Sequence, residues 1–215
     1  MDDRVRALRI LALLEKEYPK SHVALDFRDP MQLLVATILS AQCTDAQVNK
    51  VTPALFKKYG TARDYAKADL KAFEQEIHST GFYRNKAKNI LAAAKMIVSD
   101  FGGKVPDTME DLVKLPGVAR KTANILLANA FGKVVGIAVD THVARLSQRL
   151  GLSKNKDPNK IEQDLLILIP KDKWFEINYL LIDHGRAICN AKKPLCAGCV
   201  VWELCPSAKL FLKPA

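Results

Sequence analysis

The sequence predicts an all-α protein, and three observations support this. Nearly half of the 215 residues are hydrophobic (49%), which is enough to bury a core. In several segments the apolar residues recur at i, i+3, i+4 and i+7, the spacing of one helix face. The only strand-like run, residues 134–139, has no evident partner strand, and we interpret it as a buried connector.

The first two helices are predicted from different patterns. One face of the first helix carries four apolar residues at helical spacing, and Pro19 ends the helix: Ala7, Ile10, Leu11 and Leu14. Residues 31–39 are apolar all round, which is typical of a buried helix.

Three later helices follow from the same spacing. Residues 86–98 alternate lysine with Ala, Ile and Leu at helical intervals, which predicts a basic helix. A further helix has Gly132 as its expected C-cap and an apolar face formed by Ala123, Leu126, Leu127 and Ala130. A late helix is marked by Trp174, Ile177 and Leu181.

Charge narrows the class of partner. The chain carries 33 Lys and Arg against 23 Asp and Glu, a net charge of +10, which favours a polyanion such as nucleic acid over neutral partners. A merely basic housekeeping protein remains an alternative. No run of apolar residues is long enough for a membrane span, and the first twenty residues are charged throughout. We therefore expect no export signal and a cytoplasmic, nucleoid-associated location if the source is prokaryotic.

Four of the five cysteines lie in one stretch with the spacing C-x6-C-x2-C-x5-C: Cys189, Cys196, Cys199 and Cys205. Clustered thiols in a chain without an export signal indicate a metal centre rather than disulfides. Because only one pair is closely spaced and Pro206 follows the last cysteine, a [4Fe–4S] cluster is favoured over zinc, which stays open. Lys192 and Lys193 in this loop are candidate phosphate contacts. Cys43 is interpreted as a small buried residue on an apolar helix.

Residues 115–123, L-P-G-V-A-R-K-T-A, predict a tight turn that leads directly into a helix. Free backbone N–H groups at such a helix start can bind phosphate, and Gly117 lets a backbone approach closely. We expect Gly117, Val118, Ala119 and Arg120 to grip a nucleic-acid backbone without reading its sequence. An ordinary connection between two helices is the alternative. A related pattern, Gly81-x-x-Arg84-x-x-Ala87, is either a second phosphate grip or a coincidence.

Two residues are candidates for catalysis. Lys121 lies in the first turn of the predicted helix, where the helix dipole disfavours the ammonium and so favours the neutral amine that a nucleophile requires. A solvated or phosphate-binding lysine is the alternative. Asp140 begins V-D-T-H-V-A-R-L and is a candidate helix N-cap. Its second carboxylate oxygen can still act as a base or stabilise a cationic sugar.

Together these motifs are characteristic. The sequence resembles the endonuclease III family of DNA repair enzymes, within the helix-hairpin-helix glycosylase superfamily. Four blocks carry the resemblance in family order over nearly the whole chain: L-S-A-Q-C-T-D at 39–45, L-P-G-V-A-R-K-T-A at 115–123, V-D-T-H at 139–142, and the four-cysteine loop at 189–205.

The resemblance implies two helical domains with the active site between them. Residues 23–134 would form a six-helix barrel that contains the helix-hairpin-helix, and residues 1–22 with 135–215 would form the iron–sulfur domain. It also implies a bifunctional glycosylase and abasic-site lyase, acting as a monomer on oxidised pyrimidines in double-stranded DNA. Lys121 would attack C1′ of the damaged nucleotide, with Asp140 assisting. One [4Fe–4S] cluster would be held by the four cysteines.

Further residues take roles by resemblance. Gln42 matches the residue that fills the space left by the flipped nucleotide, and Phe82 stands where the family commonly has a leucine wedge. Asp45 and His142 fall in motifs near the base pocket, although a helix cap and a packed histidine are the simpler interpretations. Ala119 departs from the family glycine, which would cost about 1 kcal/mol if the position needs positive φ.

Other functions stay open at this point. A monofunctional mismatch glycosylase of the same superfamily is one, and a non-catalytic iron–sulfur DNA-binding protein is another. A zinc-binding DNA module is a third. The pair Lys121 and Asp140 argues against a pure binding protein, which needs neither a nucleophile nor a base.

Overall fold

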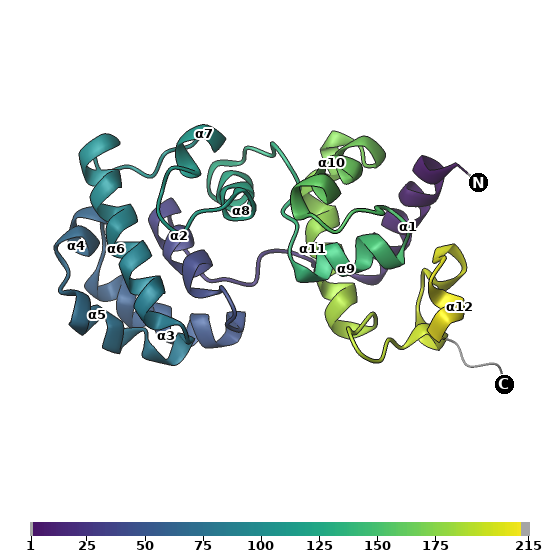
Figure 1. Cartoon of the computed structure of the whole chain (residues 1–215), viewed down its shortest axis with the longest axis horizontal. Coiled ribbons are helices and arrows are strands. Elements are labelled where there is room, and N and C mark those ends of the chain that lie inside the picture. The colour runs from purple at the N-terminus through teal and green to yellow at the C-terminus, as the bar shows by residue number, and fades with distance from the viewer. Residues whose placement is uncertain (1, 212–215) are drawn as a thin grey trace. The chain divides into compact units, whose positions relative to one another are not determined.

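The structure is a computed structural model and describes residues 2–211, whose regular secondary structure is entirely helical (Figure 1). The predicted all-α class is confirmed. The chain divides into two compact units, one formed by Met1–Val23 with Val134–Ala215 and the other by Ala24–Lys133. Among the described helices, none has both the length and the apolar character that crossing a membrane requires.

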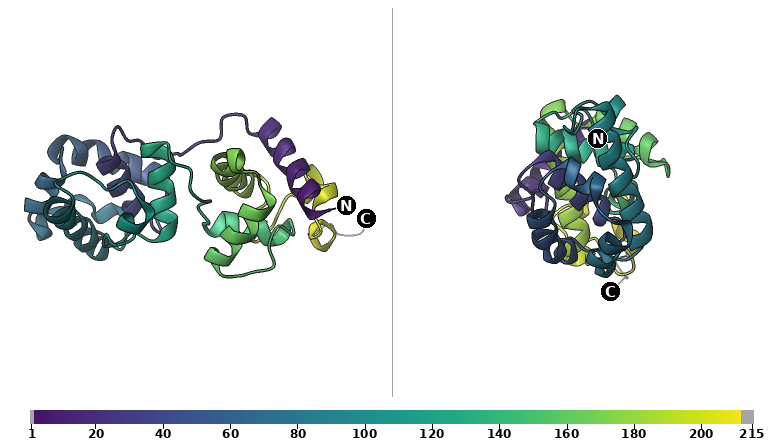
Figure 2. Two further views of the ribbon diagram at one scale, coloured as in Figure 1. Left: turned by 90° about the horizontal axis from the view of Figure 1, so that it is seen from above. Right: turned by 90° about the vertical axis from the view of Figure 1, so that its left-hand side faces the viewer.

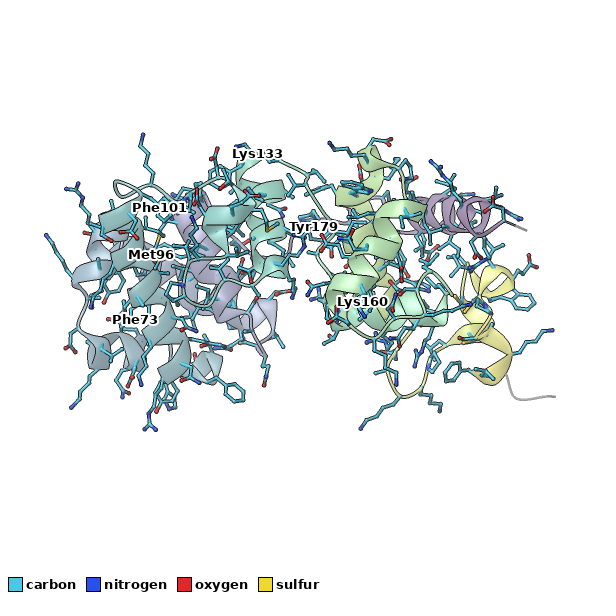
Figure 3. All side chains as sticks on the ribbon, turned by 45° about the horizontal axis from the view of Figure 1, so that its top comes forward. Phe73, Met96, Phe101, Lys133, Lys160 and Tyr179 are labelled. Carbon is cyan, nitrogen blue, oxygen red and sulfur yellow. The ribbon has the colours of Figure 1, made fainter. Side chains whose placement is uncertain are left out.

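The unit formed by Ala24–Lys133 contains seven α-helices and one 3₁₀ helix. In chain order they are α2 (Pro30–Leu39), α3 (Asp45–Lys58), α4 (Ala62–Lys67), α5 (Leu70–Glu76), η1 (His78–Thr80), α6 (Tyr83–Asp100), α7 (Met109–Leu112) and α8 (Arg120–Phe131). The long helix α6 packs against α2, α4 and α5, and α2 packs against α8. The α5 side chain of Phe73 is fully buried in this unit (Figure 3).

The boundaries of these helices follow from local chemistry. Helix α2 starts where the Asp29 side chain accepts a hydrogen bond from the Gln32 amide and Pro30 occupies the first turn. All its residues from Leu33 to Leu39 are buried, as the apolar sequence predicts. Helix α8 ends at Gly132, which has a left-handed φ of 65° and confirms the predicted C-cap.

The second unit joins the first helix of the chain to its last third. It contains α1 (Asp3–Glu17), α9 (Thr141–Arg149), α10 (Pro158–Leu168), η2 (Lys171–Lys173), α11 (Trp174–Ala187), η3 (Cys196–Gly198), η4 (Trp202–Leu204) and α12 (Ala208–Phe211). Helix α11 packs against α1 and α9. Figure 2 shows α1 and the C-terminal segment within the same unit.

Helix α1 is held by both apolar and polar contacts. Its buried residues are the four that the spacing predicts, Ala7, Ile10, Leu11 and Leu14. On another side, the Arg6 guanidinium donates hydrogen bonds to the carbonyl oxygens of Leu150 and Gly151, the latter at 2.8 Å. The connector 134–139 forms no strand, as predicted, but only part of it is buried: residues 137–139 are buried, whereas Val135 is 46% exposed.

Cys43 corrects one prediction. It does not lie on the buried helix, because α2 ends at Leu39 and Cys43 belongs to the connection between α2 and α3. Its side chain is half-buried. The apolar run that suggested a longer helix stops at Ser40, whose hydroxyl donates to the Thr37 carbonyl oxygen at 2.9 Å.

Candidate functional site

The predicted hairpin turn is formed around Gly117. Its φ is +81°, a value that L side chains rarely adopt, and a Cβ at this position would lie 2.9 Å from the Asn89 Cβ. Gly117 is therefore required twice, once by backbone conformation and once by the neighbouring α6. The residue is exposed, so its backbone is accessible from solvent.

Helix α8 begins immediately after this turn without a side-chain cap. Its N-cap residue Ala119 has φ −90° and ψ 170°, which is extended backbone, and Ala119 makes no capping hydrogen bond. The cost expected for alanine at this position is therefore absent, because positive φ is not needed. An N-terminus that no side chain caps is a position where an external acceptor such as phosphate can bind.

Helix α6 begins in a related way. Gly81 has φ +70°, the N-cap Phe82 is left-handed at φ +48°, and no side chain caps the helix. Both copies of the repeated glycine pattern thus precede helices without a capping side chain. Within residues 2–211, eight of the other helices begin with a capping Asp or Thr.

Val118 corrects the expectation that it offers a free amide. Its N–H donates to the Leu115 carbonyl oxygen at 3.1 Å, which closes the turn, and its side chain is buried. Val118 therefore packs and shapes the hairpin, while the more accessible positions around it are Gly117 and Ala119.

Lys121 is the second residue of α8 and its side chain is exposed. It thus lies one residue inside the uncapped N-terminus, as the sequence predicts. Asp140 belongs to the other unit, and its proximity to Lys121 stays a prediction.

Asp140 is the N-cap of α9 and uses only one carboxylate oxygen for this purpose. Oδ1 accepts hydrogen bonds from the amides of His142 and Val143, both at 2.8 Å. Oδ2 makes no capping bond and lies 3.4 Å from the His142 Nδ1. The two roles that the sequence allows for Asp140 are therefore compatible, since capping leaves one oxygen for other chemistry.

The two residues expected near the base pocket differ in their surroundings. The side chain of His142 is 28% exposed, and its Nδ1 is buried without a hydrogen-bond partner within the described chain. Asp45 lies in the first turn of α3, but it is not the helix cap, because the Thr44 side chain accepts from the Gln47 amide. The simple interpretation of Asp45 as a cap is therefore wrong.

Gln42 and Phe82 share an unusual conformation. Both have positive φ, 53° and 48°, and they are the only non-glycine residues of the described chain that do. Both side chains are exposed, Phe82 to 64%. A large apolar side chain held outward on a left-handed backbone is suited to insertion into another molecule.

The four cysteines line one pocket, whose volume is about 20 Å³. Cys189 follows α11, and Cys196 is the first residue of η3. Cys199 and Cys205 are the C-cap residues of η3 and η4. In the described chain no three His, Cys, Asp or Glu side chains converge on a point that one metal ion would occupy. Four thiols around one shared space form a donor set that suits an iron–sulfur cluster.

The thiols are held in a partly apolar shell. Burial raises the pKa of Cys199 to about 11, and burial also raises the pKa values of Cys196 and Cys205. These thiols therefore keep their protons until a metal group displaces them. His184 is buried beside these thiols, with its Nδ1 3.0 Å from the Tyr18 hydroxyl and its Nε2 3.4 Å from the Cys199 Sγ.

Arg149 is a residue of this site that the sequence analysis missed. Its Nη1 donates to the Cys189 Sγ at 3.3 Å and to the Asn190 carbonyl oxygen at 2.8 Å. The sequence feature that could have identified Arg149 is its spacing of four residues from Arg145, which puts both guanidiniums on one face of α9. Each of them donates a hydrogen bond to the cysteine segment. Lys192 and Lys193 are exposed on this segment.

The fold and the hairpin together define a class of protein. The family described as "HhH-GPD superfamily base excision DNA repair protein" matches residues 35–171, which include the hairpin, Lys121 and Asp140. A relative from Synechocystis, named endonuclease III, is 58% identical over 95% of this chain and 93% of its own length. A Bacillus subtilis endonuclease III is 49% identical over 87% of this chain and 86% of its own.

Solved structures agree with these relatives. A non-covalent endonuclease III–DNA complex superposes with a TM-score of 0.93 at 44% identity, covering 98% of each chain. A trapped covalent intermediate of endonuclease III with DNA gives the same TM-score and identity, with 98% and 99% coverage. The chain therefore belongs to the endonuclease III family, the bifunctional glycosylase and abasic-site lyases of base excision repair.

Proposed function

We propose that this chain removes oxidised pyrimidines from double-stranded DNA with Lys121 as nucleophile and then nicks the strand 3′ to the abasic site. The exposed lysine inside an uncapped helix start is the observation that carries the proposal. The trapped covalent intermediate of a relative with 44% identity supports an enzyme that bonds to its DNA.

The phosphate backbone is gripped first. The turn at Gly117 and the uncapped start of α8 present backbone N–H groups, and the helix dipole there favours an anion. The start of α6 repeats the arrangement after Gly81. These contacts position the duplex without reading its sequence, which suits an enzyme that must bind DNA of any sequence.

The damaged nucleotide then leaves the base stack, because its C1′ cannot be reached inside the duplex. We assign Gln42 to the space that the nucleotide vacates and Phe82 to a wedge between neighbouring bases. Their exposure and outward backbone support these roles. Damage weakens pairing or stacking, so extrusion is less costly at the lesion than elsewhere.

The chemistry follows from a neutral amine. The Lys121 Nζ forms a bond to C1′ as the bond from C1′ to the base nitrogen breaks, and the base leaves with the electron pair and gains a proton. The free Oδ2 of Asp140 accepts the proton of the attacking amine or stabilises the cationic sugar. Ring opening then gives a Schiff base. Loss of a C2′ proton expels the 3′ phosphate, and water releases the enzyme.

We also propose that the four cysteines hold one [4Fe–4S] cluster, with Arg149 donating to the Cys189 sulfur. The cluster's contribution is to cross-link the segment, since base release and elimination transfer no electrons overall. A fixed segment would hold Lys192 and Lys193 in position for phosphates. A brown protein with about four iron and four sulfide per chain is expected, and a colourless zinc protein would overturn this assignment.

Cleavage assays separate the proposal from its rivals. A duplex with one thymine glycol should be nicked by the protein without alkali. A monofunctional glycosylase would instead leave an abasic site that is cut only when alkali is added. A non-catalytic DNA-binding protein would bind the duplex and release no base.

A further inference from the structure

Lys86 is buried in α6 at 4% exposure, although the surrounding sequence suggests a helix with exposed lysines. Its Nζ donates hydrogen bonds to the carbonyl oxygens of Leu39, at 2.7 Å, and of Thr80, at 2.8 Å. Both acceptors are backbone groups. A buried cation with only backbone partners is unusual, and it invites a functional explanation.

The two acceptors have matching positions in the fold. Leu39 is the last residue of α2, and Thr80 is the last residue of η1. Carbonyls at a helix C-terminus lack intrahelical partners and carry partial negative charge, so a lysine there is stabilised. Lys86 thus caps two helix ends at once, and these ends are far apart in the sequence but adjacent in the fold.

Each capped end leads directly into a strained residue. Gln42 follows Leu39 by three residues, and Phe82 follows Thr80 by two. These are the two positive-φ residues with exposed side chains, and such conformations persist only where the surroundings over-determine them. A second link joins η1 to α3, the helix that follows Gln42, since the Gln47 Nε2 donates to the Ser79 Oγ at 2.9 Å.

We propose that Lys86 is a positioning residue that holds the Gln42 and Phe82 loops as one rigid unit for insertion into the duplex. This role of Lys86 rests on the proposed function of these two side chains. Because Lys86 binds the carbonyl at the base of each loop, neither loop can shift without breaking a bond to the same buried amine. The two side chains therefore reach the DNA at a fixed separation, with their strain already present in the free protein.

The link through Lys86 matters differently in two steps of the reaction. A thymine glycol must be driven out of the stack, which needs both inserted side chains. A preformed abasic site has no base to extrude, so it needs them less. Loss of the Lys86 link should therefore slow base release much more than it slows strand cleavage at an abasic site. A general loss of folded protein would lower both in proportion.

The test compares Lys86→Met with Lys95→Met in the full-length, cluster-loaded protein. Lys95 is exposed on the same helix, so the control has the same change of charge and size. In single-turnover assays, Lys86→Met should lower base release from a thymine glycol duplex by about tenfold or more, which corresponds to about 1.4 kcal/mol of activation free energy. Cleavage of an abasic duplex should change far less, and Lys95→Met should match the wild type in both.

A second readout shows whether Lys86 acts through the loops. In a Gln42→Ala, Phe82→Ala background, adding Lys86→Met should cause little further loss, since the side chains it positions are gone. Equal losses on both substrates, or a full additional loss in that background, would overturn the positioning role. If Lys86→Met does not fold, Lys86→Gln, which keeps a donor for one carbonyl, takes its place with the same criteria. Failure of the wild type to act on either duplex would instead overturn the proposed function.

Discussion

Gly117 and Asn89 approach so closely that a Cβ on Gly117 would lie 2.9 Å from the Asn89 Cβ. The contact locks the hairpin turn onto α6, and with φ +81° it leaves no room for any other residue. The hairpin turn is therefore fixed from two directions, by its own backbone and by a neighbouring helix.

We expect Gly117→Ala to destabilise the protein and weaken DNA binding together. The positive φ alone costs about 1 kcal/mol for alanine, and the clash with Asn89 adds to this. Gly102→Ala is the matched control, because Gly102 has φ +61° but open space around its missing Cβ. Urea unfolding and duplex affinity measure the two effects. Equal unfolding free energies for the two variants would contradict the contact.

Asp140 offers a way to separate its capping role from its chemical role. Asp140→Asn keeps an acceptor oxygen for the amides of His142 and Val143, so stability should change little while base release falls. Asp140→Ala should lose the activity and also about 1 kcal/mol of stability. Thermal unfolding beside single-turnover kinetics measures both. Full activity of the asparagine variant would rule out a catalytic carboxylate.

Affinity for duplex DNA should fall steeply with salt, because each phosphate bound by a basic side chain releases counterions. Replacing Lys192 and Lys193 by alanine should reduce the slope of log K against log salt by about 0.9 for each phosphate that is no longer neutralised. Lys154 and Lys156, on the same unit, give a control with the same reduction of charge. Identical slopes for the two double variants would contradict a specific phosphate role for the cysteine segment.

The buried lysine predicts a pH dependence of stability. Burial lowers the pKa of Lys86, while the nearby Cys43 opposes the shift. The unfolded chain therefore binds the proton more tightly, so the wild type should gain stability as pH rises from the lowered pKa toward about 10.4. Lys86→Met lacks this gain. Urea unfolding measures the free energy of unfolding with Lys86 and with Lys86→Met, both in a Cys43→Ala background. If the difference between these two free energies stays constant across this pH range, the burial of a titrating amine is contradicted.

Much of the fold could be predicted from the sequence, because periodicity reports which side of a helix is buried. The face of α1 and the buried α2 are examples. The same logic was available for Lys86, which lies on the apolar face of α6 in line with Ile90 and Ile97, but its lysine identity suggested an exposed position. Residue type and spacing disagreed there, and spacing was the better guide.

The loops were harder to predict. Positive φ at Gln42 and Phe82 leaves no mark in the sequence, since neither residue is glycine. The amide of Val118 was expected to be free, but the turn closes through it. Whether a backbone amide is free depends on which carbonyl oxygen the folded chain brings within hydrogen-bond distance of it. The clustered cysteines were predictable because ligand spacing is local, whereas Arg149 reaches them from a distant helix.

The central claim is that Lys121 forms a covalent bond to the sugar, and borohydride trapping tests it most directly. Borohydride reduces a Schiff base to a stable adduct, which appears as a shifted band on a denaturing gel. The wild type should be trapped on both a thymine glycol duplex and an abasic duplex. Lys121→Gln should form neither adduct while still binding both duplexes. Adducts formed by a clean preparation of Lys121→Gln, or none from a folded and brown wild type, would contradict the claim.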